Sequence, residues 1–227
     1  MLWQKAPILK PKKFRQKSLD SIPENWKIFD SFDWNQNIIV EVGCGNGEWV
    51  LNEAQKTPKN FYIGIERTQN RSDTFLRASH LLKISNLLAL RADAVALVGA
   101  KFPAESVSAF YFIYPNPYPK KKQASQRFCA TASFEVFHRA LQKNGSIYIA
   151  SNVYEYIEEA RVFLEKFWGY QIKFLRPIIS LIDSSPSPSI PPPSRGRDGG
   201  NWIPRTAFER KYFLRGEKLY ELLALKK

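Results

Sequence analysis

Cysteine and histidine are scarce in this chain of 227 residues, which contains two of each. Cys44 and Cys129 stand far apart, and His80 and His138 are scattered, so no zinc framework or disulfide scaffold is evident. We therefore expect no metal site. Unpaired cysteines of this kind are typical of proteins in the reducing cytoplasm.

Long apolar runs are also missing. Apolar residues make up 44% of the chain, but no stretch is long enough to predict a membrane-spanning helix. The basic segment 1–17 lacks the apolar region of a secretory signal, and we expect a cytoplasmic protein that does not bind membranes. The length suits one domain with a sizeable core.

Acidic residues are in short supply, because 21 Asp and Glu stand against 34 Lys and Arg and leave a net charge of +13. The excess positive charge concentrates in residues 1–17, 120–127 and 205–227. Such a surface attracts polyanions, and basic runs beside a ligand-binding motif favour nucleic acid as the partner. An anionic membrane surface is the lesser alternative, because none of the runs forms a clear amphipathic helix.

Strand-like and helix-like patterns alternate from residue 37 onward. The expected strands are 37–43, 61–66, 87–93, 107–115 and 145–151, with strand-like pieces near 170–176 and 206–214; the expected helices are 46–55, 69–84, 125–141 and 154–167. This alternation predicts an α/β fold, with a doubly wound, Rossmann-like parallel sheet of about seven strands and helices on both faces.

Two segments fall outside the alternation. Residues 1–30 are basic and partly aromatic, and we expect them to form an N-terminal arm, with residues 31–227 as the folded domain. Residues 183–204 are rich in proline, serine and glycine, which predicts a flexible loop within that domain.

A glycine-rich motif, Glu41-Val-Gly43-Cys-Gly45-Asn-Gly47, ends the first expected strand. Its glycines let the backbone turn tightly and approach a ligand closely. The spacing is GxGxG and not the GxGxxG of dinucleotide binders, in which the third glycine lets a helix pack beneath a diphosphate. The loop therefore suits a ligand without a diphosphate, such as S-adenosylmethionine, and Glu41 can reach the cationic amino-acid part of that molecule.

Acids also follow the next two expected strands. Glu66 is placed to form paired hydrogen bonds with ribose hydroxyls, and Asp93 can accept a hydrogen bond from the adenine amine. Because the carboxyl ends of parallel strands meet at one rim, the three acids predict an S-adenosylmethionine site there. An NAD-dependent enzyme is the main rival for this fold, but the other glycine spacing and a Tyr-x-x-x-Lys pair are not evident.

A proline-rich loop, Tyr114-Pro-Asn116-Pro-Tyr118-Pro-Lys120-Lys-Lys, follows the fourth expected strand. Its three prolines stiffen the backbone, as a loop that holds a methyl acceptor requires, and its lysines suit phosphate contacts. At these residues the chain resembles the tRNA (guanine-N7-)-methyltransferase family, whose loop reads approximately F-P-D-P-W-P-K-K-R.

The resemblance extends over about residues 37–220. It includes ExGxGxG at 41–47, GIE at 64–66, the Asp93-Ala94 turn and TAFE at 206–209, where the family has T-K-F-E. It implies a class I S-adenosylmethionine-dependent methyltransferase that modifies guanine N7 in tRNA. The family has members that act alone and members that need a partner subunit, and the short chain favours the form that acts without an obligate partner subunit. By this likeness the cofactor is bound by Glu41, Gly43, Gly45, Gly47, Glu66, Asp93 and Asn116, and the tRNA nucleotide by Lys120, Asn152, Thr206, Phe208 and Glu209.

The chain departs from the family at Asn116 and Asn152, where the family has aspartate, and at Tyr118, where it has tryptophan. Guanine N7 carries a free lone pair and needs no general base, so positioning can supply much of the acceleration. A carboxylate would also stabilise the positive charge that appears on the ring. Asn116, which we assign as the catalytic residue, keeps the shape of aspartate without its charge, while Glu209 is a carboxylate that could read the guanine edge.

Two alternatives remain open at this point. Amino-methyltransferases that act on adenine N6 or glutamine carry an Asn-Pro-Pro-Tyr motif after the same strand, and Asn116-Pro-Tyr118-Pro differs from it in order. The second alternative is a catalytically weakened paralogue that binds tRNA, as Asn116 and Asn152 together suggest.

Overall fold

A seven-stranded sheet forms the centre of the computed structural model, which describes residues 23–178, 197–198, 201–202 and 204–227. The strand order is β3-β2-β1-β4-β5-β9-β6. The first five are parallel, whereas β9 runs antiparallel to both β5 and β6. The strands are β1 (Ile38–Val42), β2 (Phe61–Glu66), β3 (Leu87–Arg91), β4 (Val107–Ile113), β5 (Leu141–Ser151), β6 (Gln171–Pro177) and β9 (Tyr220–Leu225).

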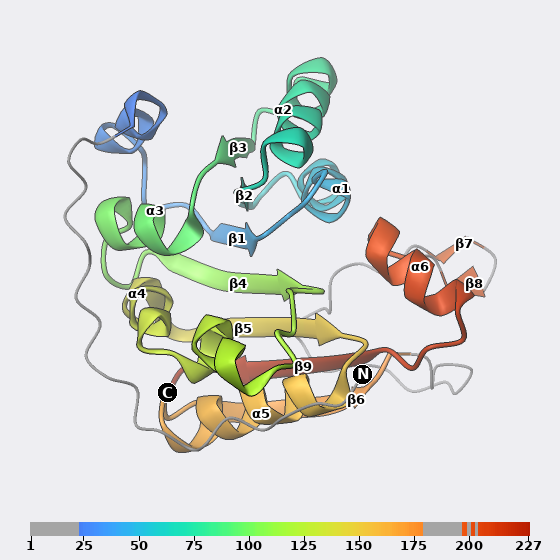
Figure 1. The fold of residues 1–227 in the computed structure, drawn as a ribbon. Coiled ribbons are helices and arrows are strands. Elements are labelled where there is room, and N and C mark those ends of the chain that lie inside the picture. The colour runs from blue at the N-terminus through green and yellow to red at the C-terminus, as the bar shows by residue number, and fades with distance from the viewer. Residues whose placement is uncertain (1–22, 179–196, 199–200, 203) are drawn as a thin grey trace.

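Helices cover both faces of the sheet, which confirms the doubly wound architecture (Figure 1). One face carries α3, α4 and α5, and the other carries α1, α2 and α6. The helices are α1 (Glu48–Lys56), α2 (Gln69–Leu82), α3 (Ala94–Lys101), α4 (Glu135–Ala140), α5 (Tyr154–Lys166) and α6 (Ala207–Leu214). In the part of the chain that the structure describes, no helix is both long and apolar enough to cross a bilayer.

Alternation along the central strands supplies both cores. In β4, Phe110 and Phe112 face the core beneath α3, α4 and α5, while Tyr111 and Ile113 face the core beneath α1 and α2. Because successive side chains of a strand point to opposite faces, a strand buried on both sides reads as one continuous apolar run. For this reason the positions of these strands could be predicted from their apolar runs.

The folded unit begins before residue 31. The 3-10 helix η1 (Glu24–Asp30) buries Trp26 and Phe29 against the core beneath α3, so these residues are packed and do not form a free arm. The rest of the expected arm, residues 1–22, lies outside the described residues. Most of the expected 183–204 loop does as well, apart from a two-stranded sheet that pairs β7 (Arg197–Asp198) with β8 (Asn201–Trp202).

The prediction of one continuous helix over residues 125–141 is wrong. Three 3-10 turns, η2 (Lys121–Gln126), η3 (Phe128–Ala130) and η4 (Ala132–Phe134), precede a short α4. The Thr131 hydroxyl donates to the Phe128 carbonyl at 3.1 Å and lies 2.6 Å from the Ser133 hydroxyl. Local hydrogen bonds of this kind compete with a continuous helix.

The end of the chain also differs from expectation. Residues 207–214, read as strand-like, form α6, and the last strand, β9, was not predicted. The sheet is therefore mixed and not wholly parallel, because β9 inserts between β5 and β6. The strand order reverses at β1, which has β2 on one side and β4 on the other. Ligands of open α/β sheets bind outside the carboxyl ends of the strands at such a point.

Candidate functional site

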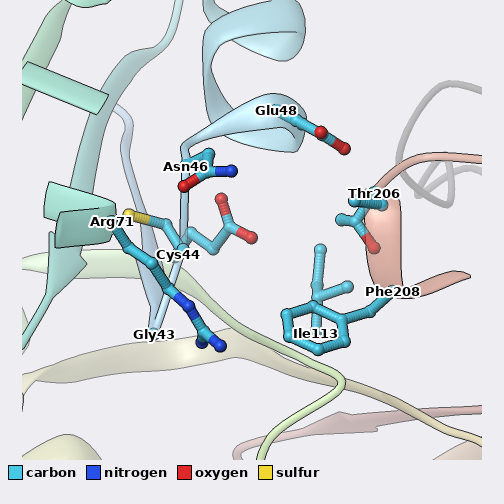
Figure 2. A pocket seen from close by; sticks show the side chains of 11 residues that line it. Gly43, Cys44, Asn46, Glu48, Arg71, Ile113, Thr206 and Phe208 are labelled. Carbon is cyan, nitrogen blue, oxygen red and sulfur yellow. The ribbon is translucent and has the colours of Figure 1, made fainter. Parts of the chain in front are cut away.

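Two adjoining cavities lie at this carboxyl rim. The larger has a volume of about 640 Å³ and is lined by the ends of β1, β2 and β4 and by the segments that follow β1, β2, β3 and β4. The smaller, of about 50 Å³, lies against the glycine-rich loop and the start of α6 (Figure 2). Both are lined by Gly43, Arg71, Ile113 and Phe208, so they form one continuous site.

The glycine-rich loop turns between β1 and α1 with three glycines at positive φ. Gly43 (φ 75°) and Gly45 (φ 59°) line the smaller cavity, where an added Cβ would meet no protein atom. Gly47 (φ 80°) lies outside both linings and precedes α1, where a Cβ would stand 2.1 Å from the Phe75 ring. The first two glycines therefore keep space open for a ligand, and the third lets α1 pack against α2.

Glu41 is the penultimate residue of β1, and its side chain lines the smaller cavity. The residue is 2% exposed, and its Oε2 atom has no hydrogen-bond partner among the described residues. Burial raises the pKa of Glu41 well above its ordinary value, while a backbone hydrogen bond from Val50 opposes that rise and Glu66 adds to it. A buried acid without a full set of partners is suited to a cationic ligand.

Glu66 and Asp93 are fixed by backbone groups at the rim of the larger cavity. Glu66 accepts hydrogen bonds from the Gly45 N–H at 2.9 Å and the Thr68 N–H at 2.6 Å. Asp93 caps α3 by accepting from the Ala96 N–H at 3.1 Å. Each carboxylate oxygen can accept more than one hydrogen bond, so both acids retain capacity for ligand hydroxyl or amine groups.

The proline-rich loop lines the larger cavity together with Glu66 and Asp93. Tyr114 (φ 51°) and Tyr118 (φ 45°) have positive φ, which costs free energy for residues other than glycine and occurs where surrounding contacts impose it. The Asn116 Oδ1 atom accepts a hydrogen bond from the Tyr118 N–H at 3.1 Å. The loop is thus held in one shape beside the cavity.

The buried side chain of Arg127 holds the proline-rich loop in this conformation. It is the last basic residue of the 120–127 run, which we expected to face RNA, but its side chain is only 1% exposed. Its Nε and Nη2 atoms donate to the Tyr118 carbonyl at 3.0 and 2.8 Å, and its Nη1 atom donates to Glu159 on α5 at 2.8 Å. Arg127 is therefore a structural brace, and the exposed charge of the run comes from its three lysines.

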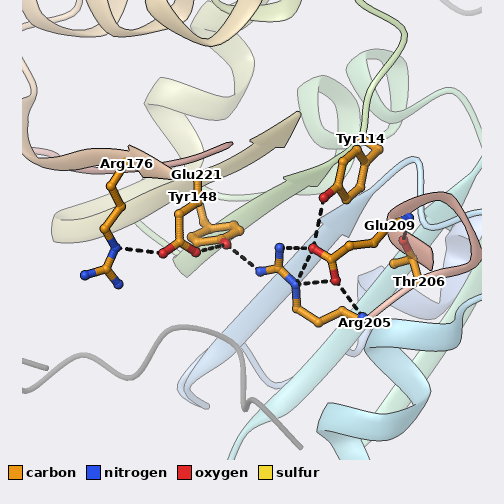
Figure 3. A network of polar contacts seen from close by, with 7 residues as sticks. All are labelled: Tyr114, Tyr148, Arg176, Arg205, Thr206, Glu209 and Glu221. Atoms are coloured by element: carbon orange, nitrogen blue, oxygen red, sulfur yellow. Dashed lines mark hydrogen bonds and ion pairs between the residues drawn. The ribbon is translucent and has the colours of Figure 1, made fainter. Parts of the chain in front are cut away.

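A buried polar network anchors α6 to the sheet (Figure 3). Arg205 forms an ion pair with Glu209, which also accepts a hydrogen bond from the Tyr114 hydroxyl at 3.0 Å. Arg205 donates to the Tyr148 hydroxyl as well, and that hydroxyl donates to Glu221 on β9 at 2.5 Å. The network continues from Glu221 to Arg176 on β6. It fixes the start of α6, and with it Phe208, over the cavities.

The structure brings most of the predicted site residues together and separates four of them. The residues that line a cavity are Glu41, Gly43, Gly45, Glu66, Asp93, Asn116, Thr206 and Phe208. Those outside both linings are Gly47, Lys120, Asn152 and Glu209. Asn152 donates to Glu217 at 2.6 Å, and Glu209 is fully buried, so the Glu209 carboxylate faces Arg205 and not the cavities.

Arg71 and Tyr212 are among the lining residues that the sequence did not indicate. Arg71 belongs to no motif, and its position in the first turn of α2 was its one indication. Tyr212 lies one helical turn beyond Phe208 on α6, and the two rings share one face of that helix.

Comparisons with known proteins agree with this geometry. A family model described as "Putative methyltransferase" matches residues 35–178. The tRNA (guanine-N(7)-)-methyltransferase of Azorhizobium caulinodans is 35% identical over 121 residues, which cover 53% of this chain and 52% of that protein. The enzyme of the same name from Syntrophotalea carbinolica is 25% identical over 172 residues, which cover 75% of this chain and 72% of that protein. The match thus spans about half the length of the first relative.

Solved structures support the fold. A SAM-dependent methyltransferase from Aquifex aeolicus aligns with a TM-score of 0.54 at 10% identity, covering 90% of each chain. A 30S ribosomal A1408 methyltransferase from an uncultured bacterium aligns with a TM-score of 0.53 at 17% identity, covering 93% of this chain and 97% of that one.

Proposed function

Because this chain belongs to the family that the "Putative methyltransferase" model describes, we propose that it transfers a methyl group from S-adenosylmethionine to guanine N7 in tRNA. The observation that carries the proposal is the pair of adjoining cavities, which has Glu41 and the glycine-rich loop at one end and the proline-rich loop at the other. The names of the two relatives support the choice of tRNA and of guanine N7. The net charge of +13 suits a polyanionic substrate.

In this proposal, one group of residues binds the cofactor and another group orients the guanine. Glu41 faces the cationic amino-acid end of the cofactor, Glu66 holds the ribose hydroxyls, and Asp93 accepts from the adenine amine. When bound, S-adenosylmethionine supplies an electrophilic methyl group. The stiff loop around Asn116 and the aromatic pair Phe208 and Tyr212 orient the guanine, since alignment alone can supply much of the acceleration. Lys120 and Asn152, outside the cavity linings, remain candidates for contacts to the tRNA backbone.

The residue order around Asn116 favours guanine N7 over an exocyclic amine. In the Asn-Pro-Pro-Tyr motif of amino-methyltransferases, the aromatic residue follows two consecutive prolines. In this chain the order is Asn116-Pro-Tyr118-Pro, so the aromatic residue stands one place earlier. We further propose that the enzyme acts without a partner subunit. We also propose that it acts in the cytoplasm, in keeping with its two buried free cysteines.

The decisive experiment replaces the N7 atom of guanine with carbon. Unmodified tRNA transcripts incubated with labelled S-adenosylmethionine should yield 7-methylguanosine on nucleoside mass spectrometry, with activity falling as salt rises. Transcripts made with 7-deazaguanosine have carbon at that position and should stay unlabelled. Label that persists on the deaza transcript would point to an amine target, and tRNA binding without any turnover would point to a non-catalytic paralogue.

Asn116→Asp should raise the rate of guanine methylation about tenfold, because a carboxylate stabilises the positive charge that develops on the ring. The variant keeps the oxygen that accepts from the Tyr118 N–H, so the loop should retain its shape. Single-turnover kinetics on one tRNA transcript would measure the change, with Asn116→Ala as the variant that lacks both charge and acceptor. An unchanged or lower rate in Asn116→Asp would show that a charge at this position has no part in the chemistry.

A further inference from the structure

Arg71 occupies the boundary between the two cavities and lies outside every motif identified in the sequence. It extends from the first turn of α2 and lines both cavities. Its guanidinium carbon lies 5.2 Å from the centre of the Phe208 ring, which reaches across from α6 (Figure 2). A cation over an aromatic face is attracted to it, so Phe208 holds the guanidinium at the mouth of the smaller cavity.

The smaller cavity has an uneven set of charges. Its lining holds two carboxyl groups, those of Glu41 and Glu48, and among the described lining residues Arg71 is the one cation. The amino-acid end of S-adenosylmethionine carries both an ammonium group and a carboxylate. The acids suit the ammonium group, whereas the planar fork of an arginine matches a carboxylate and can donate two hydrogen bonds to it.

We propose that Arg71 binds the α-carboxylate of S-adenosylmethionine and thereby makes the site selective for a ligand with an intact amino-acid end. This inference rests on the proposed function. Glu41 and Arg71 then recognise the two opposite charges of the zwitterion from different elements, β1 and α2. Phe208 positions Arg71, so the anchoring of α6 by Arg205 and Glu209 supports cofactor recognition as well as substrate binding.

Calorimetry with two ligands that differ by one group tests the proposal. Decarboxylated S-adenosylmethionine lacks the carboxylate and keeps the ammonium, the sulfonium and the adenosine. The wild-type protein should bind S-adenosylmethionine about tenfold more tightly than the decarboxylated ligand, since a hydrogen-bonded charge pair at a partly exposed site is worth about that factor. Arg71→Ala should abolish the difference by weakening the binding of S-adenosylmethionine alone. Arg71→Lys should retain part of it.

Arg77→Ala provides the matched control, because Arg77 is an exposed arginine on α2 that lines neither cavity. It should keep the wild-type preference, and the melting temperature of each variant would verify folding. Equal affinity of the wild-type protein for the two ligands would overturn the assignment, because the carboxylate would then contribute nothing to binding. An equal loss for both ligands in Arg71→Ala would also overturn it and would place the carboxylate on another group, such as the backbone N–H groups at the start of α1. If the wild-type protein bound neither ligand, the proposed function would fail with it.

Discussion

Glu209→Ala is expected to lower the free energy of unfolding by about 3–5 kcal/mol, because it leaves the charge of Arg205 buried without its ion-pair partner. Glu209 is fully buried, and the Arg205 side chain is 7% exposed. Burial alone would lower the pKa of Arg205, but the neighbouring Tyr148 and Glu209 raise it well above the ordinary value, so the guanidinium stays charged. The variant also deprives the Tyr114 hydroxyl of its acceptor. Urea denaturation would measure the loss.

A double variant separates the cost of an unpaired charge from the cost of lost packing. Arg205→Met with Glu209→Leu removes both charges and keeps most of the buried volume, so it should be substantially more stable than Glu209→Ala. Arg205→Met alone and Glu209→Leu alone complete the cycle, and if their effects added up to that of the double variant, the ion pair would contribute nothing beyond the individual side chains. A large coupling energy is the expected result.

The parallel half of the fold could be predicted because its signals are local. The apolar runs of β1, β2 and β4 each fall within seven residues or fewer, and the motifs that contain Glu41, Glu66 and Asp93 lie at or directly after strand ends. Since parallel strands share one rim, the meeting of Glu41, Glu66 and Asp93 followed from topology alone. The cavities at that rim confirm the convergence of these three acids.

The C-terminal part was misread for two different reasons. The helix α6 had an available signal, because Thr206-Ala-Phe-Glu209 is a capping box and the Thr206 hydroxyl accepts from the Glu209 N–H at 3.1 Å. The insertion of β9 between β5 and β6 depends on pairing with distant strands, which a local pattern does not encode.

Buried charges were the other failure of sequence reasoning. Arg127 and Glu209 were expected to face RNA or the guanine, since charged residues are rarely buried. Arg127 is paired with Glu159 on α5, and Glu209 is paired with Arg205 and with the Tyr114 hydroxyl. The Arg205–Glu209 pair has a spacing of four residues, but its burial depends on Tyr114 and Tyr148, which lie far away along the chain, as Glu159 lies far from Arg127.

Glu41→Gln should have opposite effects on cofactor affinity and on the stability of the ligand-free protein. Loss of a buried carboxylate that faces the ammonium group should weaken S-adenosylmethionine binding about 100-fold, because charged hydrogen bonds in a dry site are strong. Calorimetry would measure the affinity. Glu48→Gln is the matched control, because Glu48 lines the same cavity but is exposed, and its effect should be much smaller.

The stability effect follows from the raised pKa of Glu41. Between the ordinary pKa and the raised one, the folded chain holds a proton that the unfolded chain has released, so wild-type stability should fall as pH rises through this window. Glutamine cannot ionise, and Glu41→Gln should therefore melt at a higher temperature than the wild type at neutral pH but not at pH 4. Thermal melts across this range, without ligand, would test the expectation. Equal pH dependence in the two proteins would mean that Glu41 ionises as freely in the folded chain as in the unfolded one. The ligand-free cavity would then already stabilise the Glu41 carboxylate, without a bound cation.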